Sequence, residues 1–206
     1  MEALWTAAQV EGKITAKVYR DDDSFLTIDD HLPERITKFV VTDGAADRGC
    51  PQDIKPTFDE SDDTHDFDRE PFAFFAPLYM LDHSGVRISL NSFNDPWDSG
   101  CCGFVGVLKE DIVKQYGELT QDTEQQALQQ MRSEVETISN IFAGNVYGYV
   151  VEERQFCESC QTEKWETVDS CWGFVGDAKY VNENAVESLR SFLSEKGMED
   201  EIEVIA

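Results

Sequence analysis

The sequence predicts an α+β protein, with a mainly antiparallel sheet of about five or more strands packed against one long helix and one or two shorter helices. Three observations predict this class. Stretches of alternating apolar and polar residues are separated by turn residues, as in β-hairpins. One apolar stripe with helical spacing runs along residues 121–142. The elements follow in the order strands, helix pair, hairpin and helix, which is not a regular βαβ series. With 206 residues, we expect residues 1–206 to form a single domain.

The first third of the chain supplies two expected strands and a long loop. Residues 13–19, KITAKVY, alternate as a strand does, and residues 36–42, ITKFVVT, form a second strand. Residues 45–70 contain nine acidic residues against three basic ones and show no periodicity. We therefore expect an acidic loop that is a candidate for partial disorder, with Phe58 and Phe67 able to pin it to the core.

The central part supplies a hairpin, a central strand and a short helix. Residues 76–81 form a buried strand, and residues 86–90 return antiparallel after a tight turn. Residues 103–108, GFVGVL, are apolar on both faces, as is typical of a central strand. Residues 109–116 form a short helix that stops at Gly117.

The long helix is the most strongly indicated element. Thr120 is a suitable N-cap, and Gly144 ends the pattern. Its apolar residues are spaced three and four apart, which makes one stripe for the core. They are Leu128, Met131, Val135, Ile138 and Phe142. If Leu128 is buried, replacing it with alanine would cost about 2–5 kcal/mol.

The last third is expected to form a hairpin and a final helix. Residues 146–153 and 165–175 are the two strands, with CESCQTE at the connecting tip. Residues 186–193 form the helix, and the acidic end of the chain can add a short edge strand.

A large acidic excess dominates the composition, since 42 acidic residues face 17 basic ones and the net charge is −25. Such a surface repels nucleic acids and anionic membranes, and it attracts basic surfaces. A requirement for solubility, or a halophilic-type acidic surface, would explain the same net charge. No run of eighteen apolar residues is present, and the start of the chain lacks the features of a signal peptide. We therefore expect no membrane contact and a cytoplasmic location.

Four polar residues form a candidate catalytic group: Asp82, His83, Asp95 and Asp98, next to Trp97. Carboxylates and an imidazole at this spacing suit metal-assisted hydrolysis or nucleotide binding. The alternative is that the aspartates only form β-turns and that Trp97, like Trp172, belongs to the core. No phosphate-binding loop, dinucleotide fingerprint or basic patch is present, so we favour a protein that is not an enzyme.

The cysteines are a candidate metal site. Cys157, Cys160 and Cys171 have the spacing C-x2-C-x10-C, and two thiolates at a hairpin tip can hold zinc. Cys50 or His65 would have to supply the fourth ligand. Free thiols and a disulfide are the alternatives. We expect no cofactor and folding without zinc.

Two stretches of the chain repeat each other, WDSGCCGFVG at 97–106 and VDSCWGFVG at 168–176. Their flanking residues differ, so they do not indicate a duplicated unit. We expect two central or near-central strands with similar packing, which would place Asp98 and Asp169 at comparable edges of one sheet.

Taken together, several motifs resemble an uncharacterised family of bacteriophage and conjugative-element proteins. They are PLYMLDHSGVRISL, DPWDSG followed by GF, VYGYVVE and DSCWGF, and they extend from about Pro77 to Phe174. Cys101-Cys102 and the CESC tip are not part of this resemblance. The resemblance implies a mobile genetic element, and hence the cytoplasm of a host cell, but no established activity.

The charge and the resemblance together suggest a function. We expect an acidic interaction protein that inhibits a host nucleic-acid-handling defence enzyme by imitating the charge of a nucleic acid. The partner would be a basic host protein, with no direct nucleic-acid or membrane binding. The residues expected to contact it are Asp59, Glu60, Asp62, Asp63, Asp66, Asp68, Glu199, Asp200 and Glu201.

Overall fold

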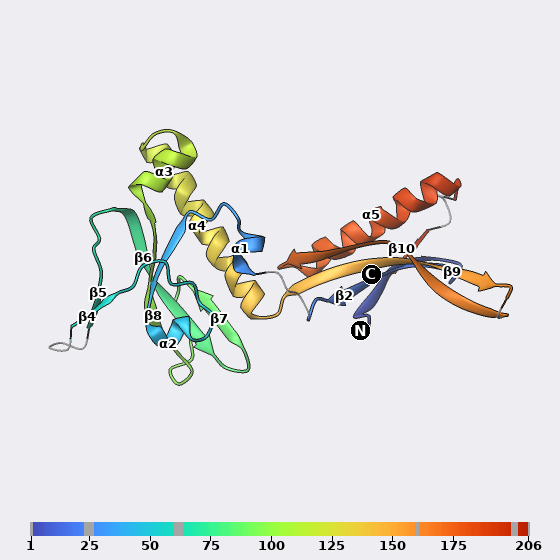
Figure 1. Cartoon of the computed structure of the whole chain (residues 1–206), viewed down its shortest axis with the longest axis horizontal. Coiled ribbons are helices and arrows are strands. Elements are labelled where there is room, and N and C mark those ends of the chain that lie inside the picture. Colours follow the sequence, from blue (N-terminus) through green and yellow to red (C-terminus); the bar gives the residue numbers. More distant parts are fainter. Residues whose placement is uncertain (1, 23–26, 60–63, 160, 199–201, 206) are drawn as a thin grey trace. The chain divides into compact units, whose positions relative to one another are not determined.

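The computed structural model describes residues 2–22, 27–59, 64–159, 161–198 and 202–205. Its contacts divide the chain into two compact units. Unit 1 combines residues 1–26 with 144–206, and unit 2 is residues 27–143. The α+β class is confirmed, with antiparallel sheets and helices in both units (Figure 1). The expectation of one sheet was wrong, because the predicted strands divide between two sheets.

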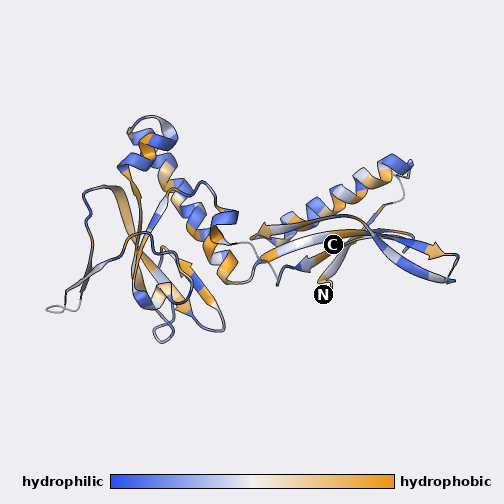
Figure 2. Cartoon of the chain, in the orientation of Figure 1, coloured by the Kyte–Doolittle hydropathy of each residue, from blue (hydrophilic) through white to orange (hydrophobic). Residues whose placement is uncertain are grey.

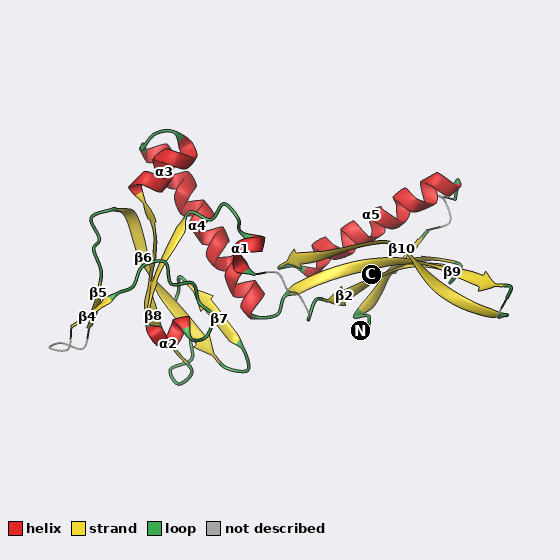
Figure 3. Ribbon diagram, viewed as in Figure 1, coloured by secondary structure: helices red, strands yellow, loops and turns green. Residues whose placement is uncertain are grey.

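Unit 1 is a five-stranded antiparallel sheet with one helix on one face (Figure 3). The strand order is β10-β9-β2-β1-β11. The elements are β1 (Trp5–Val10), β2 (Ile14–Arg20), β9 (Val146–Cys157), β10 (Thr162–Val175), α5 (Ala178–Lys196) and β11 (Glu203–Val204).

The helix α5 is longer than the expected 186–193. It begins at Asp177, whose carboxylate accepts a hydrogen bond from the Lys179 backbone at 2.9 Å, and it ends at Gly197 in the left-handed conformation. Its buried side chains, including Val181, Leu189 and Leu193, pack on β1, β2 and β9. Among the described residues of unit 1, α5 is the helix that packs on this sheet, and it covers one of the two faces.

Unit 2 is a four-stranded antiparallel sheet in the order β3-β8-β6-β7, with a separate small hairpin. Its strands are β3 (Thr37–Val41), β4 (Thr57–Asp59), β5 (Thr64–Asp66), β6 (Phe72–Asp82), β7 (Val86–Ser89) and β8 (Ser99–Leu108). Its helices are α1 (Ile28–His31), α2 (Asp43–Ala46), α3 (Lys109–Tyr116) and α4 (Gln121–Phe142).

The helix α4 starts at Thr120, where a reciprocal pair of hydrogen bonds with Thr123 caps the first turn. Its buried stripe is shifted slightly from the expected one, because Ala127 and Met131 are buried while Leu128 is only half-buried. Figure 2 shows hydrophilic and hydrophobic residues alternating along both long helices. This alternation buries one stripe of each helix and leaves the rest in water.

Residues 45–70 differ from the expected loop. The described part of this segment contains the end of α2 and the strands β4 and β5, which pair with Phe58 opposite His65. Phe67 is buried against Phe72, Phe75 and Phe104 on the face of the sheet away from α4. The prediction that Phe67 pins this segment is therefore confirmed.

The repeated stretch has a local explanation. Gly103 and Gly173 both have positive φ, and each lies at or next to a register shift in its strand pairing. A glycine in this conformation is typical of a β-bulge, which bends the strand. The expectation of two central strands was only half right, since β8 is central but β10 is an edge strand of the other sheet. Asp98 and Asp169 therefore belong to different sheets.

Candidate functional site

The four polar residues singled out from the sequence gather at one end of the unit 2 sheet. Asp82 ends β6, and the backbone N–H of Asp82 donates to the carbonyl of Asp98 at 2.9 Å. This bond continues the β6–β8 ladder, in which Leu81 lies opposite Ser99. Antiparallel pairing thus brings residues sixteen positions apart into contact, and the alternative of isolated turns does not describe the whole arrangement.

Asp95 holds the loop between β7 and β8. Its carboxylate accepts backbone hydrogen bonds from Trp97 and Asp98, both at 3.0 Å. These bonds, first that from Asp98 and then that from Trp97, lower the pKa of Asp95 because they stabilise its charged form. Asp95 therefore acts as a turn former, as the turn reading of Asp95-Pro96 predicted.

His83 and Asp98 form a side-chain pair. The His83 Nδ1 atom lies 2.5 Å from Asp98 Oδ2, and both side chains are accessible to solvent. A carboxylate on one ring nitrogen orients the imidazole and leaves the other nitrogen, Nε2, available for proton transfer or for a partner. An imidazole oriented in this way has the arrangement of a general base with its supporting carboxylate.

A small cleft of about 230 Å³ adjoins the pair. Arg48 of the segment after α2 forms an ion pair with Asp82 at its rim, and Cys101 and Asp98 also line it. Sequence reasoning missed Arg48 and Cys101 as members of this site. No local pattern connects Arg48 to a strand end thirty-four residues later, so only the tertiary fold reveals the contact.

Trp97 corrects the interpretation that it belongs to the core. Its side chain is 91% exposed, at the tip of the loop that Asp95 holds. Trp172 is 38% exposed, on the α5-free face of unit 1, and is likewise not a core residue. Tryptophan is enriched at the energetic centres of protein interfaces.

The structure separates two of the three candidate zinc ligands. Cys157 lies opposite Thr162 at the end of the β9–β10 hairpin, whereas Cys171 lies opposite Tyr149, eight positions back along β9. At about 3.3 Å per residue this is a separation of roughly 26 Å. Cys171 therefore cannot share a metal ion with Cys157. Cys160 lies outside the described residues. Within the part of the chain that the structure describes, no three His, Cys, Asp or Glu residues are grouped as a metal site.

Most of the acids expected to contact a partner lie outside the described residues. Glu60, Asp62, Asp63, Glu199, Asp200 and Glu201 lie outside the described residues, and the side chains of Asp59 and Asp66 do too. Asp68 is exposed, and its carboxylate accepts the backbone N–H of Glu70 at 3.0 Å.

Comparisons with protein-family models, with curated proteins and with solved structures found no match for this chain. Among the described residues, no helix is both long enough and apolar enough to span a membrane.

Proposed function

We propose that this protein works by binding a basic partner, and that the partner is a host enzyme that handles nucleic acid. The observation that carries the proposal is Trp97, which projects 91% exposed from a fixed loop between the carboxylates of Asp95 and Asp98. An apolar anchor surrounded by acids suits a partner surface that has a pocket bordered by lysine and arginine.

The distribution of charge supports a basic partner. Among the described residues, ten lysine and arginine side chains form ion pairs with carboxylates. The net charge of −25 already counts these cations, and the acidic excess is present in both units. The resulting negative field attracts basic surfaces and speeds their association. A surface that binds nucleic acid in other proteins has this basic character, which makes competition with nucleic acid the expected mode of inhibition.

The proposal is tested by capture and displacement. The purified protein is immobilised and exposed to a bacterial lysate, and the bound proteins are eluted either with salt or with excess duplex DNA. We expect the two eluates to contain the same proteins, and we expect Trp97→Ala to reduce their capture roughly tenfold or more, as for an interface hot spot. Tyr180→Ala, which removes an exposed aromatic side chain from α5 of unit 1, is the matched control. Capture that is insensitive to DNA, salt and Trp97→Ala would refute the proposal.

One observation favours a second function, a small hydrolase. The His83–Asp98 pair beside the cleft has the geometry of a general base with its orienting carboxylate. In that case the acidic surface would be incidental, and divalent metal would have to be supplied from solution. Screening of phosphoester and nucleotide substrates with Mg²⁺ or Mn²⁺ tests this function. His83→Ala should then abolish turnover while Trp97→Ala preserves it.

A further inference from the structure

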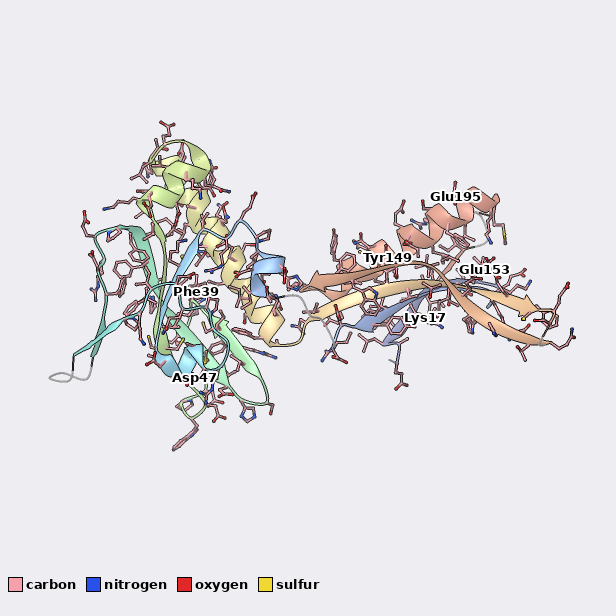
Figure 4. The ribbon with its side chains drawn as sticks, in the orientation of Figure 1. Lys17, Phe39, Asp47, Tyr149, Glu153 and Glu195 are labelled. Atoms are coloured by element: carbon pink, nitrogen blue, oxygen red, sulfur yellow. The ribbon has the colours of Figure 1, made fainter. Side chains whose placement is uncertain are left out.

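The face of the unit 1 sheet that α5 leaves uncovered has an ordered set of side chains. Direct strand pairing places Tyr19, Gly148 and Trp172 in one row, Lys17, Val150 and Ser170 in the next, and Thr15, Glu152 and Thr167 in the third. Figure 4 labels Lys17 on this face, and Tyr149 and Glu153 on the face toward α5. The ion pair between Glu153 and Lys196 of α5 confirms which face is which.

Exposed aromatic side chains lie along this one face. Trp165 is 43% exposed, Trp172 is 38% exposed and Phe156 is 57% exposed. Trp172 lies over the backbone of Gly148, where an added Cβ would come within 2.3 Å of the indole, and its ring centroid is 6.0 Å from that of Tyr19. Gly148 therefore lets the indole lie across β9 toward β2. A surface built in this way resembles the aromatic-rich centre of a protein interface.

The charged side chains of this face form ion pairs with one another. On β2, β9 and β10, Lys17 bonds Glu152 at 2.8 Å, and Arg154 forms an ion pair with Glu163. The Lys17 ammonium also lies 4.9 Å from the centre of the Trp165 ring. Among the described residues of the five strands, Glu203 of β11 is the one further acid on this face, and it accepts a hydrogen bond from Gln9. This face is therefore close to neutral on a chain of net charge −25.

We infer that the α5-free face of the unit 1 sheet binds a second copy of this chain, face to face, to form a two-fold dimer. Two copies repel each other wherever unpaired acids meet, so a nearly neutral face is where they can approach. A basic partner would gain little by binding this face, because the carboxylates of the face are already paired with lysine and arginine. This inference does not depend on the proposed function, which rests on Trp97 in unit 2.

The dimensions of the face fit such an interface. The β9 and β10 strands contain 12 and 14 residues, or roughly 40 Å at about 3.3 Å per residue. Five strands spaced about 4.8 Å apart span roughly 24 Å. The strands β1, β2 and β11 are shorter, but the area of the face is still comparable with that of a standard interface, which buries about 800 Å² on each partner. A two-fold axis across the strands would place the Trp172 end of one copy on the Trp165 end of the other.

Sedimentation velocity of the full chain from low to high micromolar concentration tests the inference. We expect a monomer–dimer equilibrium that tightens severalfold between about 0.05 and 0.5 M NaCl, because salt screens the repulsion between two acidic copies. Binding of a basic partner weakens under the same change, so the two interactions are separated by the sign of their salt dependence. A chain that stays monomeric at both salt concentrations would overturn the inference.

Two matched variants locate the interface. Thr167→Glu places a carboxylate on the α5-free face, and we expect it to weaken the dimer roughly tenfold or more, because each copy must bury an unpaired charge. Gln155→Glu adds the same charge at an exposed position on the opposite face of the hairpin, and it should leave the dimer unchanged. If the Thr167→Glu variant does not show the native circular dichroism spectrum, Trp165→Ala takes its place, and we expect it to weaken the dimer in the same way. A dimer that withstands the variant in use would place the contact elsewhere.

Discussion

At the scale of single residues, Glu134 is the most unusual side chain of unit 2. It is only 4% exposed, yet its carboxylate accepts hydrogen bonds from the backbone of Ile36 and Thr37 at 3.1 and 3.0 Å and from Gln130 at 2.8 Å. The Thr37 hydroxyl donates to it as well. One side chain of α4 therefore fixes the start of β3, through hydrogen bonds to a charged acceptor that are stronger than neutral ones.

Glu134→Gln tests this role. The amide keeps the size of the side chain but presents an NH₂ group to backbone donors, so at least one donor loses its acceptor. We expect the free energy of unfolding to fall by about 2–4 kcal/mol. Urea denaturation followed by circular dichroism measures it, with Glu136→Gln on the exposed side of α4 as control. Equal stability of the two variants would contradict the role given to Glu134.

Two buried thiols make the folding stability of the protein depend on pH. Burial raises the pKa of Cys50 and of Cys102 to about 12. In the unfolded chain these thiols ionise near about pH 8.5, so folding stability is complete below that pH and is lost as the pH rises toward 12. Each thiol should contribute a slope of about 1.4 kcal/mol per pH unit once the unfolded form is ionised.

Denaturant titrations between pH 8 and about pH 9.5, below the range in which tyrosines ionise, measure this slope. Cys102→Ala should remove the share of one thiol relative to the parent chain. The exposed Cys101 provides the control, since Cys101→Ala should leave the slope unchanged. A thiol reagent should also modify Cys101 and Cys171 in the native protein while it spares Cys50 and Cys102.

At the scale of elements, the helix α4 shows which residues carry the packing. Met131 is 1% exposed in the main core cluster, whereas Leu128 is only half-buried at its margin. We expect Met131→Ala to cost about 2–5 kcal/mol and Leu128→Ala clearly less. Thermal and urea unfolding of the two variants compare them directly. A larger cost for Leu128 would mean that the buried stripe follows the simple leucine pattern of the sequence after all.

Local sequence patterns predicted the helices and strands better than they predicted which strands pair with each other. Alternation identified β2 and β7, apolar runs next to turn residues identified β3 and part of β6, and caps identified both ends of α4. The strand β1 was missed because its alanines carry little strand signal. The assignment of strands to sheets could not be read locally, since β2 pairs with β9 across more than a hundred residues. In the candidate site, turn residues predicted Asp82, Asp95 and Asp98, but nothing near them predicted Arg48.

At the scale of the whole molecule, self-repulsion among the carboxylates opposes folding. With a net charge of −25, bringing the acids together on two compact units costs free energy that salt can screen. The ion pairs work in the opposite direction, but most are exposed and each contributes little.

We therefore expect the melting temperature to rise by several degrees between about 0.02 and 0.5 M NaCl, corresponding to roughly 1 kcal/mol or more. Differential scanning fluorimetry at fixed pH measures this rise. Sucrose, which stabilises without screening, separates the charge effect from general exclusion. A melting temperature that falls with salt would mean that the ion pairs outweigh the repulsion.

The interrupted path of unit 1 has a consequence for synthesis on the ribosome. Arg20 of β2 pairs with Tyr147 of β9, so the N-terminal hairpin emerges long before its neighbour strand exists. At 5–20 residues per second the delay is roughly 6–25 s. Unit 2 is continuous and can close during this interval, whereas the nascent β1–β2 hairpin waits with its apolar face uncovered. A ribosome-bound chaperone would bind this exposed apolar face, and slower translation would lengthen the interval before β9 is synthesised.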